Sequence, residues 1–307
     1  MPYTPSSARI NPPLPRGSWD THFHIFPPSA PLAPNAPFTP PRIPLSEDER
    51  FHSQLGTPNR VLAHSFALAD LSSLEQWVGG SGAGERRALV LLTDDMGADE
   101  IVHRQREGVR GIRAVTKAED AKGKAREIKS MMERLQEAGV RWTVAVQEAA
   151  TPGVWDHLLA IVDTMPDQIL MIDHLGFLPG PWNQNPPLIP TAEECCKLPH
   201  VDAVLALLSR KNTYIKLSAP YRLTSRYEAL EGLVKAVAKA APERIVWASD
   251  WPFVPTPAEI KASKERGDTE VTFQPEDMPK WITLLREWLG EDLFNKMMVA
   301  NPAKIYA

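Results

Sequence analysis

The sequence predicts a single α/β domain, a closed (β/α)8 TIM barrel with long proline-rich loops at the C-terminal ends of its strands. Eight short apolar segments alternate with helical segments, which is typical of a parallel sheet. The length of 307 residues suits eight such units. A hydrophobic content of 43% is enough for a large core. An open doubly wound sheet is the alternative architecture.

The expected elements follow from apolar periodicity. The strands are short runs rich in β-branched and aliphatic residues: 18–26, 60–65, 87–93, 109–115, 140–147, 168–173, 213–217 and 244–249. The helices carry apolar residues three and four apart: 47–56, 68–78, 98–107, 117–138, 152–165, 201–210, 226–240, 278–289 and 291–297. Within 117–138, for example, Ile128, Met132 and Leu135 share one face and Gly139 ends the helix.

The 30 prolines gather in a few segments, with strong apolar patterning between them. These segments are 1–15, 27–44, 179–199 and 251–257. They predict long loops on a rigid scaffold rather than a disordered chain. We therefore divide the chain into a proline-rich N-terminal arm, 1–16, and a barrel, 17–307.

Composition excludes several classes of function. The net charge of -4 gives no basic footprint for nucleic acid, and no apolar run reaches the ~20 residues of a membrane span. Residues 1–16 lack the apolar core of a secretory signal. The two cysteines, Cys195 and Cys196, are adjacent and cannot join distant segments, which favours a reducing compartment. We expect a cytoplasmic protein, monomeric or homodimeric, whose partner is a small-molecule substrate.

Two histidines at the end of the first strand are the first candidates for chemistry. His22 and His24 lie two apart and therefore face one side, with Trp19 and Phe23 expected on the other. Two imidazoles presented together suit catalysis or metal binding. A chance His-x-His in a loop is the alternative.

The remaining candidates lie where the other strands end, because a barrel of this class carries its active site there. Because alternate residues of a strand share a face, His174 is expected on the same face as Leu170 and Ile172, and Asp250 on the same face as Val246. The polar residues at the strand ends are His22, His24, His64, Ser65, Asp94, Asp95, Arg113, Gln147, His174, the segment 216–222 and Asp250.

Each of these residues has a simpler explanation when it is taken alone. His174 could belong to a strand exit, Asp250 could cap the segment that follows, and Arg113 could pair with a surface carboxylate. For His64 we favour packing over ligation. We expect structural or solvated roles for His52, His103, His157 and His200, and turn formation for Asp94 and Asp95. Four coincidences are needed to dismiss His22, His24, His174 and Asp250 together.

Six segments resemble a known family when they are taken in order. They are DTHFHIF, GVRGIRAV, ILMIDHLG, YIKLSAPYRL, RIVWASDWPF and NPAKIYA. Together, from about Gly17 to Tyr306, they resemble the amidohydrolase-2 branch of the amidohydrolase superfamily, and within it the 2-pyrone-4,6-dicarboxylate lactonase type.

This resemblance implies a (β/α)8 barrel that hydrolyses a lactone or a related bond. It implies four catalytic residues, a pair of arginines that bind substrate carboxylates and a serine near the pocket. The catalytic residues are His22, His24, His174 and Asp250; the arginines are Arg113 and Arg222; the serine is Ser65.

Departures from the lactonase pattern bear on the substrate. Phe177 stands where those enzymes carry an arginine, Phe38 stands where they carry a tyrosine, and Lys117 is displaced from the position of a second arginine. A buried carboxylate without partners is costly. We therefore expect a lactone less charged than the dicarboxylate, bound by Phe177 and Phe38 and against apolar walls from Trp182, Trp251 and Phe253.

The resemblance also bears on metal ions. Two-metal members of the superfamily use a lysine on the fourth strand and a histidine on the fifth, and neither 111–115 nor 144–147 contains one. A single zinc needs about three protein ligands, which His22, His24 and Asp250 could supply, with His174 nearby. We expect no metal and no other cofactor; one Zn²⁺ is the alternative.

The mechanism expected from these residues is hydrolysis by activated water. Asp250 would act as the base, with a share taken by His24, and His22 and His174 would donate to the oxyanion. Two alternatives stay open: a mononuclear-zinc decarboxylase or hydrolase of aromatic acids on the same barrel, and an inactive barrel that only binds a small molecule.

Overall fold

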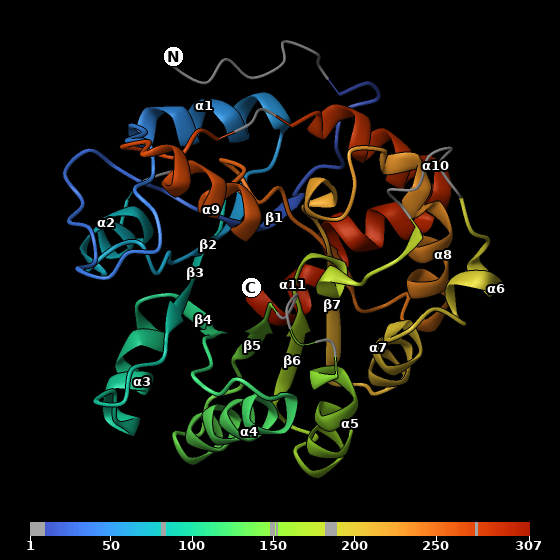
Figure 1. The fold of residues 1–307 in the computed structure, drawn as a ribbon, viewed down its shortest axis with the longest axis horizontal. Helices are drawn as coiled ribbons and strands as arrows, with labels where there is room; N and C mark the ends of the chain where they lie inside the picture. The colour runs from blue at the N-terminus through green and yellow to red at the C-terminus, as the bar shows by residue number, and fades with distance from the viewer. Residues whose placement is uncertain (1–9, 81–83, 148–150, 152, 182–188, 274–275) are drawn as a thin grey trace.

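The computed structural model describes residues 10–80, 84–147, 151, 153–181, 189–273 and 276–307. Eight parallel strands follow one another around one sheet in chain order, with helices outside them (Figure 1). The strands are β1 (Trp19–Phe23), β2 (Asn59–Ala63), β3 (Arg86–Leu91), β4 (Val109–Ala114), β5 (Thr143–Val146), β6 (Ile169–Ile172), β7 (Thr213–Leu217) and β8 (Ile245–Trp247).

Hydrogen bonds between the last strand and the first close the sheet. The Thr21 hydroxyl donates to the Trp247 carbonyl at 2.7 Å. Beyond β8, the Asp250 amide donates to the His22 carbonyl at 2.9 Å, and the His24 amide donates to the Trp251 carbonyl at 2.7 Å. The predicted (β/α)8 barrel is confirmed, and its closure brings two candidate catalytic segments side by side.

Most helices lie within a few residues of their predicted positions. These are α1 (Leu45–Leu55), α2 (Ser72–Val78), α3 (Ala98–Arg106), α4 (Ala121–Glu137), α5 (Val154–Thr164), α7 (Val201–Leu208), α8 (Glu231–Ala240) and α10 (Met278–Asn295). The two helices expected at 278–289 and 291–297 are joined in α10 across a kink at Gly290, whose φ is 71°. None of the helices in the described part of the chain combines the length and the apolar character that a membrane span requires.

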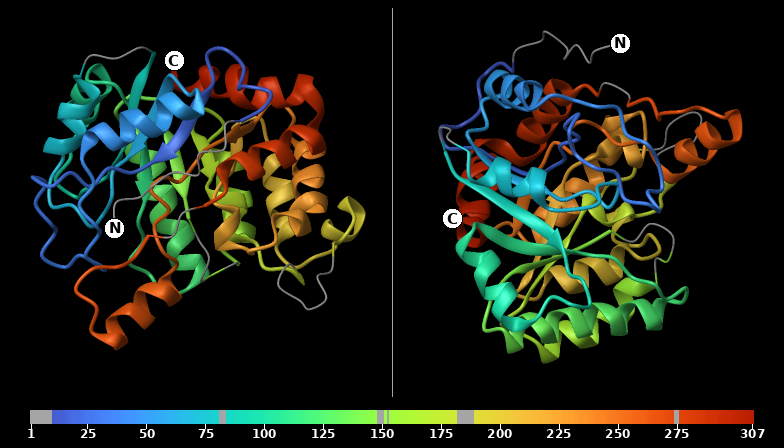
Figure 2. Two further views of the ribbon diagram at one scale, coloured as in Figure 1. Left: turned by 90° about the horizontal axis from the view of Figure 1, so that it is seen from above. Right: turned by 90° about the vertical axis from the view of Figure 1, so that its left-hand side faces the viewer.

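Three short helices were not predicted: α6 (Ala192–Cys195), α9 (Pro257–Arg266) and α11 (Asn301–Tyr306). Helix α9 projects away from the barrel (Figure 2). It begins at a capping box formed by Thr256 and Glu259, a local signal that apolar periodicity does not detect.

The first strand departs from the simple alternation that we expected. Trp19 lies in the inner cluster with Val61 and Tyr306, whereas Phe23 packs in the outer cluster between sheet and helices. The register of β1 against β2 shifts between Asp20 and Phe23, which changes the face on which side chains emerge. The prediction that Trp19 shares the face of Phe23 is therefore wrong, while His22 and His24 do point to one side.

The described part of the N-terminal arm is held against the last long helix. The Arg286 guanidinium on α10 donates to the carbonyls of Pro12 and Pro13 at 2.6 and 2.9 Å. Residues 1–9 of the arm lie outside the described residues.

At the bottom of the barrel, Tyr306 of α11 is fully buried beside Trp19, so the strands enclose a packed floor below the mouth.

Candidate active site

Three imidazoles surround one carboxylate oxygen at the mouth of the barrel. The Nε2 atom of His24 lies 3.6 Å from Asp250 Oδ1, and the Nε2 atoms of His22 and His174 each lie 3.8 Å from it. All four side chains are buried. Among the described residues, no donor lies within hydrogen-bonding distance of Oδ1. The structure thus brings together the four residues whose convergence we expected.

The other oxygen of Asp250 is held firmly. Arg222 donates from Nε to Oδ2 at 2.9 Å, and its terminal nitrogen lies 2.9 Å from the same oxygen. The Tyr221 hydroxyl donates to it at 2.6 Å. Burial alone would raise the pKa of Asp250, but Arg222 and the imidazoles of His174 and His24 outweigh it and hold that pKa well below its usual range. Asp250 is thus an oriented anion at neutral pH.

A hydrogen bond to the backbone determines which ring nitrogen of His24 carries the hydrogen. Its Nδ1 atom lies 2.7 Å from the Ala63 carbonyl, which can only accept, so Nδ1 carries the hydrogen and Nε2 presents a lone pair. Burial lowers the pKa of His24 although Asp250 opposes this shift. His24 is therefore a neutral imidazole whose acceptor nitrogen faces His22 and Asp250.

His174 is oriented by side chains on both of its ring nitrogens. Its Nδ1 lies 2.9 Å from the Ser218 hydroxyl, and its Nε2 lies 2.9 Å from the Gln147 amide nitrogen. Arg113 donates to the Gln147 amide oxygen at 3.2 Å, so the amide nitrogen faces His174. The Nε2 of His174 thus accepts, and the expected role of donor to an oxyanion is corrected. Burial lowers the pKa of His174 to about 4.

A buried ion pair lies behind the first-strand histidines. The Lys216 ammonium on β7 is 2.8 Å from Asp173 Oδ1 and 3.2 Å from His22 Nδ1, and none of these side chains is exposed. Burial first, then Lys216, lowers the pKa of His22 well below its usual value. We listed Lys216 among the polar residues at the strand ends, within the segment 216–222, but assigned it no role. A lysine inside an apolar strand was the available signal, because fully buried lysines are rare unless paired.

Backbone strain is concentrated in the same loops. His174 and Asp250 adopt left-handed φ angles of 51° and 59°, and so do Leu175, Phe177 and Ala219 at 54°, 48° and 48°. Such a conformation costs a non-glycine residue about 1–2 kcal/mol. Strain of this kind persists where the surroundings enforce it, often at functional sites. Strand β8 ends at Trp247, so the alternation of side chains along a strand, which we used to place Asp250, does not extend to this residue. The left-handed backbone at Asp250 directs its side chain to the site instead.

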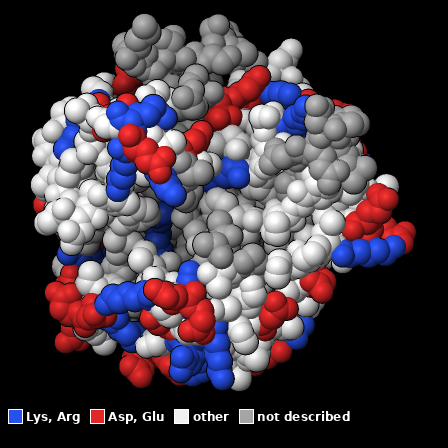
Figure 3. Space-filling model, in the orientation of Figure 1, with Lys and Arg blue, Asp and Glu red and all other residues white. Residues whose placement is uncertain are grey.

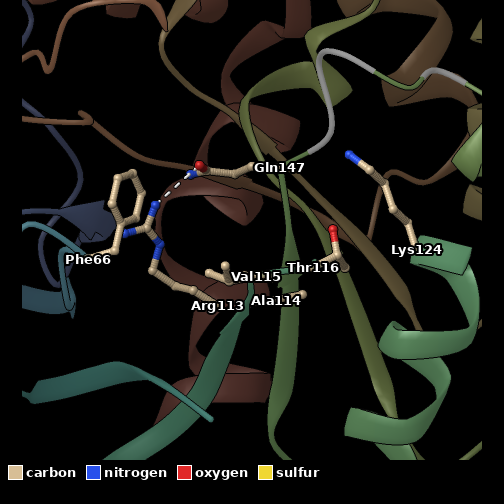
Figure 4. Close-up of a pocket in the computed structure, with 8 residues that line it drawn as sticks. Phe66, Arg113, Ala114, Val115, Thr116, Lys124 and Gln147 are labelled. Atoms are coloured by element: carbon tan, nitrogen blue, oxygen red, sulfur yellow. Dashed lines mark hydrogen bonds between the residues drawn. The ribbon is translucent and has the colours of Figure 1, made fainter. Parts of the chain in front are cut away.

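Beside the imidazoles, Arg113 borders a cavity of about 310 Å³ (Figure 4). It donates to the His64 carbonyl at 2.8 Å and lies over the Phe66 ring at 5.3 Å. Its hydrogen-bond partners, the His64 carbonyl and Gln147, are neutral, so its charge can serve a ligand. Figure 3 shows a hollow on this face with basic side chains at its edge. The cavity is lined by Phe66, Arg113, Ala114, Val115, Thr116, Lys124, Ala145 and Gln147.

Three other predicted binding residues lie at the site or close to it. Phe177 contacts His174 with ring centroids 5.4 Å apart, so it does border the site. Ser65 is buried beside His64, and its hydroxyl accepts from the Ala67 amide at 3.2 Å. Phe38 packs behind Phe66 with centroids 6.4 Å apart, one layer from the cavity.

Four expectations for pocket residues need correction or concern a residue that the structure does not describe. Trp251 is buried and stacks on Phe51 of α1 at 5.5 Å, so the prediction that it forms a pocket wall is wrong. Phe253 is likewise buried. Trp182 lies outside the described residues. Arg222, expected to bind a substrate carboxylate, instead pairs with Asp250 at 2.9 Å.

Two further histidines are structural. His64 is buried, and its Nε2 donates to the Asp70 carbonyl at 2.8 Å, away from the cluster. His52 of α1 lies 3.0 Å from Asp20 and 2.7 Å from Asp48. Asp20 also accepts from the backbone amides of His22 and Ser249 at 3.2 and 3.0 Å. The buried His52–Asp20 pair therefore connects α1 to β1, which carries His22, and to the segment after β8, which carries Asp250.

The donor atoms of the cluster suit a divalent cation in type and spacing. His22, His24 and Asp250 form one set, and His22, Asp173 and His174 form another, each with its ligand atoms within 4.8 Å of one another. Two or three imidazoles with a carboxylate are typical zinc ligands.

Neutral imidazoles around an ionised, oriented carboxylate at a barrel mouth form the acid–base set of an enzyme active site. More closely, the chain belongs to the amidohydrolase family, whose model matches residues 19–307. The family expected from the sequence is thereby confirmed.

Named relatives cover nearly the whole chain. It is 24% identical to a 4-sulfomuconolactone hydrolase of Hydrogenophaga intermedia, over 95% of this chain and 89% of that protein. It is 22% identical to a 2-pyrone-4,6-dicarboxylate hydrolase of Comamonas testosteroni, over 95% and 91%. It is 27% identical to a D-galactarolactone isomerase of Agrobacterium fabrum, over 98% and 94%. A solved structure from Agrobacterium tumefaciens, 22% identical, covers 96% of this chain and 97% of its own with a TM-score of 0.69, which supports the fold.

Proposed function

We propose that this protein is a lactonase, which opens the cyclic ester of a small, singly anionic compound with water. One observation carries the proposal: Asp250 Oδ1 lies among three imidazoles while its other oxygen is held by Arg222 and Tyr221. The similarity to hydrolases of sulfomuconolactone and pyrone dicarboxylate supports a lactone as substrate.

Two acceptors at the mouth suit a nucleophilic water. Asp250 Oδ1 and the Nε2 lone pair of His24 lie 3.6 Å apart, so one water can donate to both. As the water oxygen attacks the ester carbonyl, its proton passes to Asp250, and His22 donates from Nε2 to the oxyanion. When the ring C–O bond breaks, Asp250 returns the proton to the leaving oxygen. The products are a carboxylic acid and an alcohol or enol.

Charge at the site favours one substrate anion. Among the charged side chains packed around His22, His174 and Asp250, the three cations Arg113, Lys216 and Arg222 exceed the two carboxylates Asp173 and Asp250 by one. Lys124 of α4 lines the cavity outside this cluster. Lys216 and Arg222 are each paired with a carboxylate, which leaves Arg113 to bind a substrate carboxylate or sulfonate. The phenyl ring of Phe177 offers no partner to a second anionic group.

The same charges oppose a metal ion. Held by His22, His24 and Asp250, a divalent ion would supply a Lewis acid and a more acidic water. It would stand beside the Lys216 ammonium, 3.2 Å from His22, and the Arg222 guanidinium on Asp250, and like charges in a buried site repel strongly. We therefore propose metal-independent catalysis. Less than 0.1 zinc per chain, by a rough criterion, and full activity in chelator are expected; one zinc per chain with loss of activity in chelator would contradict it.

The assignment of reaction is tested with a panel of neutral, singly anionic and doubly anionic lactones in ¹⁸O-labelled water. The proposal predicts preference for a singly anionic lactone and one labelled oxygen in the new carboxylate. Preference for the pyrone dicarboxylate would overturn the substrate assignment. Isomerisation without label, decarboxylation, or stabilising binding without turnover would overturn lactone hydrolysis.

The setting of the reaction stays a prediction. Cys195 and Cys196 are free thiols, one buried and one exposed, as is common in a reducing compartment. We propose a cytoplasmic enzyme whose partner is its small-molecule substrate, acting as a monomer or homodimer.

A further inference from the structure

We infer that Lys216 is a positioning residue: its ammonium holds His22 in the tautomer that carries hydrogen on Nε2, so that His22 always presents a donor to the substrate carbonyl. The inference rests on the proposed lactone hydrolysis for its catalytic consequence. Its structural part stands on the contacts of Lys216 alone.

The position of Lys216 is set from two sides. It lies on β7 in the barrel interior and is fully buried. Its Nζ is 2.8 Å from Asp173 Oδ1, at the end of the neighbouring β6. Nζ also lies 3.2 Å from His22 Nδ1 on β1, which is separated from β7 by β8 alone. The ion pair with Asp173 anchors the ammonium against the imidazole.

The chemistry of the contact selects one tautomer. An ammonium group has three donors and no acceptor, so a hydrogen bond to His22 Nδ1 requires a lone pair on that nitrogen. The hydrogen of neutral His22 is then on Nε2. The competing contact, from Nδ1 to Asp173 Oδ2, is longer at 3.5 Å.

The opposite end of His22 agrees with this assignment. His22 Nε2 lies 3.2 Å from His24 Nε2, and this contact needs one donor and one acceptor. The Ala63 carbonyl places the hydrogen of His24 on Nδ1, so His24 Nε2 is the acceptor. A chain of donors thus runs from Lys216 through His22 to His24. A substrate carbonyl that replaces His24 as the acceptor meets a hydrogen already in place, without a change of tautomer.

The tautomer is read directly in the wild-type protein. Histidine labelled with ¹⁵N gives long-range ¹H–¹⁵N correlations that distinguish protonated from bare ring nitrogens, and His22→Gln assigns the signals. We expect a bare Nδ1 and a protonated Nε2 for His22. A protonated Nδ1 overturns the inference, whether or not the enzyme opens lactones. Conversely, if the expected tautomer is found but no lactone is opened, the proposed function fails and the positioning of His22 stands.

Kinetics test the catalytic consequence. Lys216→Met leaves the Asp173 carboxylate buried without its cation and can prevent folding, so the double variant Lys216→Met/Asp173→Asn, which removes both charges, is measured beside it. We expect kcat to fall roughly 10²–10³-fold, as on loss of one oxyanion donor, with little change in KM. Lys235→Met, at an exposed lysine of α8 paired with Glu231, is the matched control. A folded double variant with wild-type kcat overturns the inference.

Discussion

The Tyr221 hydroxyl donates a 2.6 Å hydrogen bond to Asp250 Oδ2, the oxygen that Arg222 also holds. The carboxylate is therefore clamped on one side, and Oδ1 remains directed at the imidazoles. A clamp of this kind orients the base, but it also weakens it, because donors to the charged form lower its proton affinity.

Removal of the Tyr221 hydroxyl should loosen the clamp. For Tyr221→Phe we expect kcat to fall about tenfold, the effect of one hydrogen bond to a charged group, and the acid limb of kcat/KM to move to higher pH as the pKa of Asp250 rises. Tyr227→Phe, which removes a hydroxyl bound to Glu276 in the adjacent cavity, is the control. A pH profile of Tyr221→Phe identical to wild type would contradict the role of Tyr221.

Arg113 should govern the binding of anionic substrates. Arg113→Met removes the guanidinium that borders the cavity, and KM for singly anionic lactones should rise about 10–100-fold, the range of a hydrogen bond to a charged group. Neutral lactones should be affected much less. Arg110→Met tests the same substitution three residues earlier on β4, at a side chain bound to the Gln105 carbonyl. Equal losses for neutral and anionic lactones would remove Arg113 from this role.

Phe177 should limit the number of substrate anions. Phe177→Arg adds a cation beside His174, where the dicarboxylate lactonases carry an arginine, and should raise kcat/KM for the pyrone dicarboxylate relative to a singly anionic lactone roughly tenfold. Phe177→Met controls for loss of the ring. If the ratio does not change, a different residue sets the charge preference.

Stability should be greatest near pH 6.5, because two buried histidines are shifted in opposite directions. Burial lowers the pKa of His174 to about 4, so its contribution is lost as pH falls from 6.5 toward 4. Burial also disfavours charged His52, but Asp20 and Asp48 raise its pKa to about 9. Its contribution, complete below 6.5, is lost as pH rises through 9. Each shift is worth on the order of 3 kcal/mol.

Unfolding free energies measured by denaturant between pH 4 and 9 should trace this maximum. His52→Gln should flatten the alkaline side, and His103→Gln, at an exposed histidine of α3, should not. An unchanged alkaline slope in His52→Gln would show that the pair with Asp20 and Asp48 does not hold the proton.

Sequence patterns identified the barrel and the residues at its mouth, because periodicity and strand ends are local properties. They could not locate the register shift in β1, since this shift, which turns Trp19 inward, depends on pairing with β2. Nor could sequence patterns show which cation pairs with a carboxylate and which is available to a substrate. Arg113 and Arg222 look alike in the sequence, and only the fold shows that one pairs with Asp250 while the other faces neutral acceptors. Lys216 acquires its role only when closure of the barrel brings β1 within one strand of β7, so that the Lys216 ammonium reaches His22.

The most direct test of the account is single-turnover hydrolysis by Asp250→Asn, with the lactone that wild type opens fastest. The amide keeps the shape and the contact with Tyr221 but cannot take a proton from water. We predict a fall of about 10²–10⁴-fold in the rate of the chemical step, with the fold intact by circular dichroism. A rate near that of wild type would contradict the claim that Asp250 activates the water.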